Sequence, residues 1–64
     1  MTRQVNAAID QLPPEHQEVI RLRFFEEASL PEIAALVGCP VGTVKSRLTR
    51  ARQLLRRQLR EARG

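Results

Sequence analysis

The sequence predicts an all-α domain built from four helices. Two observations carry this prediction: apolar residues recur at intervals of three and four, and every proline and glycine lies at or near the end of a periodic segment. No segment alternates apolar and polar residues as a half-buried strand does. The 64 residues are expected to form one domain spanning 1–64, because a domain typically takes about 100 residues.

The first two predicted helices are separated by Pro13 and Pro14. Apolar residues at positions 5, 8, 9 and 12 predict a helix over about 3–12. Pro14 suits the first turn of a second helix over about 14–26, because its missing N–H has no partner there. This second helix carries more apolar residues than one buried stripe needs, so some of them are expected to face a partner: Val19, Ile20, Leu22, Phe24 and Phe25.

The third and fourth predicted helices flank a short turn. Ser29 followed three residues later by Glu32 has the form of a capping box, which predicts a helix over about 30–37. Gly38 suits the left-handed position after that helix, and Pro40 prevents its continuation. A long fourth helix is predicted over about 41–62 by the spacing of Val44, Leu48, Ala51, Leu55, Leu59 and Ala62.

Charge is divided unequally along the chain, although the formal net charge is only +4. Residues 1–37 hold three Arg and Lys against six Asp and Glu, whereas residues 38–64 hold eight against one. A basic half in which Arg predominates indicates a polyanionic partner, because the guanidinium fork matches phosphates and guanine edges.

A short helix, a turn containing glycine and a basic second helix predict a helix-turn-helix motif, whose second helix lies in the DNA major groove. On a helical wheel Val44, Leu48 and Ala51 define the buried direction, and polar side chains occupy the outward side. We expect base contacts from Lys45, Ser46, Thr49 and Arg50, and phosphate contacts from Arg47, Arg52, Arg56 and Arg57. The alternative is an ordinary solvated helix face.

Several runs of the chain closely resemble region 4 of bacterial sigma factors of the extracytoplasmic-function group. The resemblance covers nearly the whole chain, and its most specific part is the run C-P-V-G-T-V-K-S-R-L at 39–48. The other matching runs are L-P-P-E at 12–15, V-I-R-L-R-F-F-E at 19–26, E-I-A at 32–34 and R-A-R at 50–52.

This resemblance implies a domain of the winged-helix-like DNA-binding superfamily without a wing, whose long last helix is the recognition helix. It implies binding to the promoter −35 element as a duplex, with Lys45, Ser46, Thr49 and Arg50 at the bases and Pro40 and Thr43 near the backbone. The same surface in the family also meets the β-flap of RNA polymerase and an anti-sigma factor. Both proteins are therefore expected partners.

Other chemistries are not expected. The chain has no Gly-rich phosphate loop and no Ser-His-Asp set, and one cysteine with one histidine cannot form a four-ligand zinc site. We therefore expect no enzyme, cofactor, metal site or small-molecule substrate. Without a signal peptide or an apolar run long enough to cross a membrane, the chain is expected to be cytoplasmic and to have no membrane partner.

Three residues invite smaller structural interpretations. Arg23 is expected to pair with Glu32, which opens the next helix. His16 is expected to be exposed, and Cys39 is interpreted as a small side chain that fits the turn.

Two alternatives to promoter recognition remain open. The acidic first half and the surplus apolar residues of 14–26 favour a protein-interaction module that binds an anti-sigma factor or the β-flap without reading DNA. An effector domain of a two-component regulator would need a last helix that dimerises. The spacing up to Leu59 permits this only weakly, because arginines flank that stripe.

Overall fold

The computed structural model describes the backbone of residues 2–63 and the side chains of residues 3–61. It contains four helices: α1 (Thr2–Asp10), α2 (Pro14–Phe24), α3 (Leu30–Val37) and α4 (Val41–Arg63). No strand occurs between residues 2 and 63, which confirms the all-α class. The side chain of Ala62, the last residue of the predicted apolar stripe, lies outside the described side chains.

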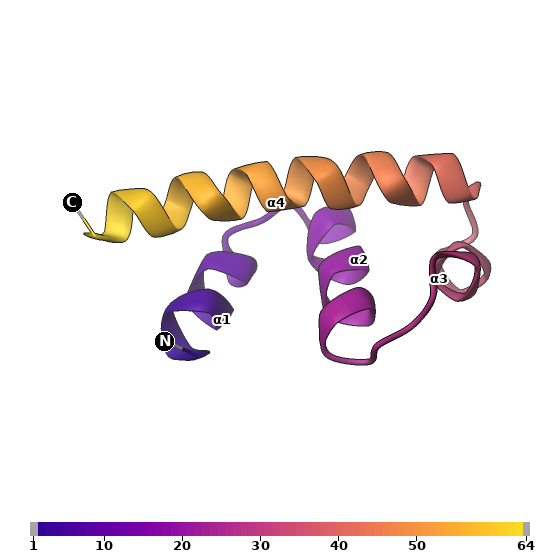
Figure 1. The fold of residues 1–64 in the computed structure, drawn as a ribbon, viewed down its shortest axis with the longest axis horizontal. Helices are drawn as coiled ribbons and strands as arrows, with labels where there is room; N and C mark the ends of the chain where they lie inside the picture. The colour runs from indigo at the N-terminus through magenta and orange to yellow at the C-terminus, as the bar shows by residue number, and fades with distance from the viewer. Residues whose placement is uncertain (1, 64) are drawn as a thin grey trace.

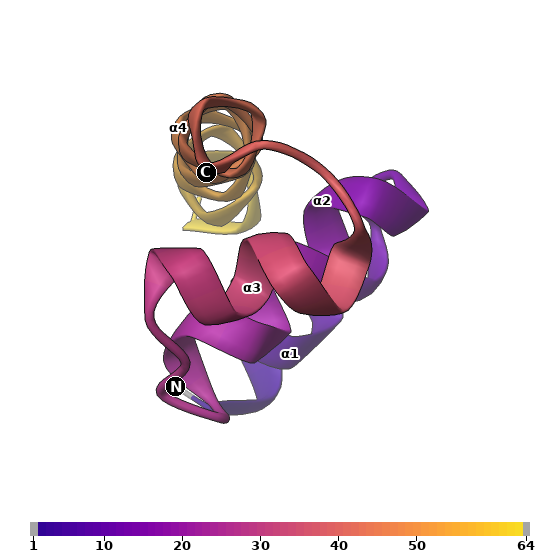
Figure 2. The same cartoon turned by 90° about the vertical axis from the view of Figure 1, so that its right-hand side faces the viewer.

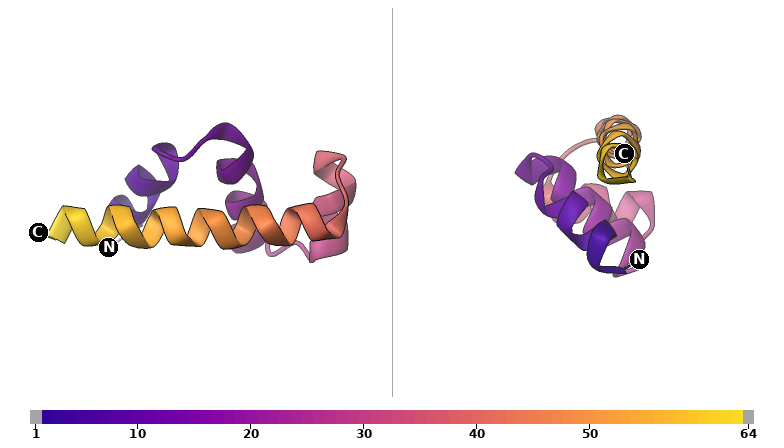
Figure 3. Two further views of the ribbon diagram at one scale, coloured as in Figure 1. Left: turned by 90° about the horizontal axis from the view of Figure 1, so that it is seen from above. Right: turned by 90° about the vertical axis from the view of Figure 1, so that its left-hand side faces the viewer.

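Helix α4 forms one layer and the three shorter helices form the other. It runs along the whole molecule, with α1, α2 and α3 on one side of it (Figure 1). The view along α4 shows the same separation (Figure 2). At about 1.5 Å per residue, its 23 residues measure about 34 Å, close to the longest dimension of the molecule, 37 Å. Seen from above, α3 lies at the N-terminal end of α4, and α1 lies beside its C-terminal half (Figure 3).

The core lies between these two layers and draws on all four helices. Val19, Ile33, Val44 and Ala51 are completely buried. The other buried members of the core cluster are Ile9, Leu12, Ile20, Ala28 and Leu48. Because the buried residues of α4 recur every three or four positions, they hold one face of that helix against the layer below and leave the opposite face free.

Helix α1 ends at Asp10, two residues before the expected end. The amide N–H groups of Gln11 and Leu12 donate to the carbonyls three residues back, at 3.2 and 2.9 Å, so the chain tightens into a turn. Leu12 precedes Pro13, whose ring disfavours helical backbone in the residue before it. An ion pair of 2.6 Å between Asp10 and Arg21 then joins α1 to α2.

Helix α2 also ends two residues early, at Phe24 rather than residue 26. Glu27 takes a left-handed backbone conformation with φ of 55°, which reverses the chain. This conformation is uncommon for a residue other than glycine. Because position 27 is a glutamate, the sequence offered no signal that the helix would end here. The reversal brings the Ala28 N–H to the Leu22 carbonyl at 2.9 Å and leaves Ala28 buried.

The prediction that Arg23 pairs with Glu32 is wrong. The Arg23 guanidinium donates to the Ala28 carbonyl at 3.1 Å, where it stabilises the reversal between α2 and α3. The Glu32 carboxylate instead accepts the Ser29 N–H at 2.9 Å, while the Ser29 hydroxyl accepts the Glu32 N–H at 3.2 Å. The predicted capping box is therefore present, and it holds the pKa of Glu32 below its ordinary value.

Candidate nucleic-acid interface

The turn between α3 and α4 sets the angle of the helix-turn-helix motif. Gly38 ends α3 in the left-handed conformation, with φ of 72°, and its N–H donates to the Ala34 carbonyl at 2.9 Å. The Pro40 carbonyl then accepts two N–H groups from the first turn of α4, that of Thr43 at 3.0 Å and that of Val44 at 3.1 Å. The two predicted backbone contacts lie beside this end of the helix: Pro40 directly precedes α4 and is exposed, and Thr43 lies in its first turn and is half-buried.

The four predicted base-contacting residues lie together on the first half of α4. Lys45, Ser46, Thr49 and Arg50 are all exposed, whereas the intervening Leu48 is 5% exposed. The structure therefore brings these four side chains onto a surface that the rest of the domain leaves uncovered. We call these four residues the reading face. The Arg50 guanidinium also donates to the Gln53 side chain at 3.4 Å, a neighbour on the same exposed side.

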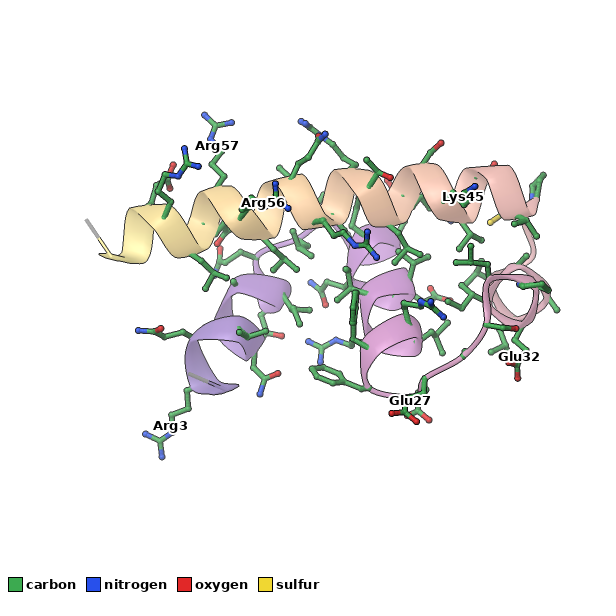
Figure 4. All side chains as sticks on the ribbon, in the orientation of Figure 1. Arg3, Glu27, Glu32, Lys45, Arg56 and Arg57 are labelled. Carbon is green, nitrogen blue, oxygen red and sulfur yellow. The ribbon has the colours of Figure 1, made fainter. Side chains whose placement is uncertain are left out.

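The four predicted phosphate-contacting arginines differ in their surroundings. Arg56 and Arg57 are exposed, and Arg47 is half-buried. Arg57 points away from the other three helices (Figure 4) and lies 3.7 Å from the Glu61 carboxylate, one turn further on. Both side chains of that pair are more than 70% exposed, so solvent screens it and the guanidinium remains available to another anion.

Arg52, the fourth of these arginines, is also exposed, and it contacts an aromatic ring on another helix. Its guanidinium carbon lies 5.7 Å from the centre of the Phe24 ring on α2. This distance is within the range of a cation–π contact.

The unequal charge of the sequence becomes a separation in space. Figure 4 shows Glu27 and Glu32 on the side of the molecule away from α4, while Lys45, Arg56 and Arg57 project from α4 itself. Helix α4 has no acidic residue in its first turn, so nothing there opposes the positive end of its dipole. The acidic residue of α4, Glu61, lies near its C-terminal end, so a polyanion that approaches the N-terminal half of α4 meets only basic charged side chains on that helix.

A second surface is apolar and lies beside the C-terminal half of α4. It is a hollow of about 430 Å³, lined by residues of α1, α2 and α4 together with Phe25. Its lining residues, which we call the apolar groove, are Val5, Ile9, Ile20, Phe24, Phe25, Leu55 and Leu59, with Arg52 and Arg56 alongside. Phe24 is 52% exposed and Phe25 is 51% exposed.

The sequence identified this groove only in part. The surplus of apolar residues in the second helix signalled that some would be exposed, and Phe24 and Phe25 are the ones that are. The sequence did not predict that Val5 and Leu59 would line the groove. Each continues the apolar stripe of its helix, and only the packing of the helices shows that these two residues border a hollow instead of the core.

The remaining singled-out residues show no arrangement for chemistry. His16 is half-buried rather than exposed, and its Nδ1 atom has no hydrogen-bond partner. Cys39 is a half-buried free thiol packed against the core. Across residues 2–63, no group of three or more His, Cys, Asp or Glu is placed to hold a metal ion. Within the same range, no helix has the length and apolar character needed to cross a membrane.

Comparison with known proteins places these features in a family. The family model described as sigma-70, region 4, matches residues 2–55. The ECF RNA polymerase sigma factor SigW of Bacillus subtilis is 41% identical over 61 residues, which is 95% of this chain and 33% of that protein. The RNA polymerase sigma factor SigV of the same organism is 47% identical over 55 residues, 86% of this chain and 33% of that protein.

A third relative comes from another bacterium. The ECF RNA polymerase sigma-E factor of Escherichia coli is 47% identical over 47 residues, 73% of this chain and 25% of that protein. The chain thus spans between a quarter and a third of the length of these relatives. The match of the family model to most of the chain, together with the helix-turn-helix geometry, shows that the chain belongs to the sigma-70 region 4 family.

Proposed function

We propose that this domain binds the promoter −35 element as part of a sigma factor that directs RNA polymerase to start transcription. The observation that carries this proposal is the reading face, four exposed polar residues on the helix-turn-helix helix whose opposite side is buried in the core. Placed in the major groove, Lys45 and Arg50 donate to guanine O6 and N7, and Ser46 and Thr49 approach either type of base pair.

Phosphate contacts supply most of the affinity in this proposal. Three arginines of α4 are proposed to contact the phosphates beside the DNA major groove: Arg47, Arg56 and Arg57. The positive end of the α4 dipole, with no acidic residue in the first turn, also favours a phosphate near Pro40 and Thr43. Such contacts position the helix without reading sequence, so selectivity comes from the reading face. A single domain of this size binds weakly, and tethering to polymerase raises its local concentration at the promoter.

A direct test measures binding of the chain to a labelled duplex by fluorescence anisotropy. A duplex with a GGAAC-like −35 element, the type this family favours, is compared with a scrambled duplex of the same length and composition at two salt concentrations. The proposal predicts a preference of several-fold for the first duplex and a steep loss of affinity with salt for both. Equal affinity for the two duplexes would contradict sequence reading by this domain.

The apolar groove favours a second function, the binding of a protein partner. Two half-exposed phenylalanines within one hollow are typical of a surface that receives apolar side chains. We propose the polymerase β-flap as the partner, with an anti-sigma factor as a competitor. Apart from Arg52 and Arg56, the residues that line this groove are not among those predicted to contact DNA.

The two functions are separable by substitution and by salt. Phe25→Ser is expected to weaken binding to a β-flap fragment at least tenfold and to leave DNA affinity unchanged, because Phe25 lines the groove and lies outside the reading face. Binding through an apolar groove also depends little on salt, in contrast to DNA binding. If Phe25→Ser leaves binding to the β-flap fragment intact, the groove is not the polymerase surface.

A further inference from the structure

The contact between Arg52 and Phe24 joins α4 to the end of α2. The guanidinium carbon of Arg52 lies 5.7 Å from the centre of the Phe24 ring, and both side chains are exposed. A cation within about 6 Å of a ring centre is attracted by the negative face of the ring. The ring therefore restricts a side chain that would otherwise sample many rotamers.

Arg52 lies at the boundary between the apolar groove and the reading face. It lines the groove, and it also lines a second, smaller hollow that includes Lys45 and Thr49. Arg52 follows Thr49 by three residues and Lys45 by seven, so the three side chains share one side of α4. That side is a flank of the recognition helix, where a helix lying in the major groove passes close to the phosphate backbone.

We propose that Phe24 is a positioning residue for DNA binding that acts through Arg52. Its ring holds the guanidinium on the flank of α4, from which the guanidinium reaches a phosphate. A long side chain that is already ordered loses less conformational entropy on binding, so preorganisation by the ring increases affinity. This inference rests on the proposed DNA-binding function, and it assigns a part in it to a residue that does not touch DNA.

The contacts of the neighbouring side chains single out this pair. Among the described residues, Arg52 makes a cation–π contact with Phe24, whereas Arg23 donates to the Ala28 carbonyl and Arg57 pairs with Glu61. Phe25 lines the same groove and is exposed to the same degree, yet no guanidinium among the described side chains lies over its ring. Phe25 is therefore a matched control for the loss of an exposed phenylalanine.

The test is a double-mutant cycle on affinity for the GGAAC-containing duplex, with Phe24→Leu, Arg52→Gln and the double variant. We expect Phe24→Leu to weaken binding about threefold, the size of an exposed cation–π contact. In the Arg52→Gln background, the same substitution is expected to have no further effect. Phe24→Tyr keeps a ring and is expected to retain wild-type affinity. Phe25→Leu is expected to leave affinity unchanged, and thermal unfolding confirms that each variant is folded.

Each other outcome overturns the inference. If Phe24→Leu weakens binding equally with and without Arg52, Phe24 has a structural role only. If Phe24→Leu binds as tightly as the wild type or more tightly, the ring does not position Arg52 for DNA. When the wild type still prefers the GGAAC-containing duplex, either result leaves the proposed function intact. Failure of the wild type to bind DNA removes both.

Discussion

Val44 and Arg50 lie six residues apart on α4, and only one of them is accessible. Val44 is 0% exposed within the core, whereas Arg50 stands on the exposed side. Six residues of helix rotation separate the two directions by about 120°. The packing of Val44 therefore fixes how α4 is turned about its own axis, and that rotation decides which of its side chains are exposed. The core thus determines which residues are available for the proposed contacts with DNA.

The position of α3 depends on one buried side chain. Ile33 is 0% exposed and is the buried residue of that helix. Ile33→Ala is expected to lower the free energy of unfolding by about 2–5 kcal/mol, through lost transfer energy and the cavity left behind. Urea denaturation followed by far-UV circular dichroism measures this loss. Ile33→Val, the control, is expected to cost about 0.5–1.5 kcal/mol.

The small size of the domain makes the effect of Ile33→Ala easy to detect. Its free energy of unfolding is on the order of 5 kcal/mol, so Ile33→Ala is expected to leave a large fraction of the chain unfolded. A loss no greater than that of Ile33→Val would show that α3 is not anchored to the core through this residue.

The capping box at the start of α3 predicts a dependence of stability on pH. Hydrogen bonds from the backbone N–H and then the hydroxyl of Ser29 lower the pKa of Glu32 from its ordinary value of 4.5. A carboxyl whose pKa is lowered by folding stabilises the fold fully above its unfolded pKa. This contribution is lost as the pH falls through the lower, folded value.

The measurement is a series of denaturant unfolding curves from neutral pH to below the ordinary pKa of Glu32. The wild type is expected to lose stability on acidification, and Glu32→Gln, which keeps the size of the side chain but does not titrate, is expected to lose less. Identical pH profiles for the two proteins would contradict the role of the ionised carboxylate in the cap.

The sequence predicted both ends of α3, because each end is determined by the types of one or two neighbouring residues. The Ser29 and Glu32 cap and the left-handed Gly38 are read directly from residue types, and the structure confirms both. The early end of α2 escaped prediction, because Glu27 rather than a glycine takes the left-handed conformation there. The reversal buries Ala28 in the core, a tertiary contact that no local sequence pattern predicts.

The candidate site divides in the same way. A helical wheel separates the buried and exposed sides of α4, and the exposure of Lys45 and Arg50 agrees with it. The contact of Arg52 with Phe24 joins residues 28 positions apart on two helices, so the wheel of one helix could not predict it. The apolar groove escaped full prediction for the same reason, since it exists only where three helices meet.

Phosphate contacts predict a measurable change in salt dependence. Arg57→Ala is expected to weaken binding to specific and scrambled duplexes by the same factor and to reduce the slope of log affinity against log salt by about one. Arg3→Ala is the matched control, because it removes the same charge from α1, where Arg3 projects away from α4 (Figure 4). If both substitutions reduce affinity and salt dependence equally, the change reflects net charge alone and Arg57 makes no specific phosphate contact.

The measurement that tests the central claim most directly is the selectivity of Arg50→Ala. Its affinities for the GGAAC-containing and scrambled duplexes are measured by anisotropy beside those of the wild type and Arg57→Ala. If α4 reads the −35 element, Arg50→Ala loses the preference between the duplexes, whereas Arg57→Ala binds more weakly but keeps it. If Arg50→Ala retains the full preference of the wild type, the exposed side of α4 does not read the promoter through Arg50.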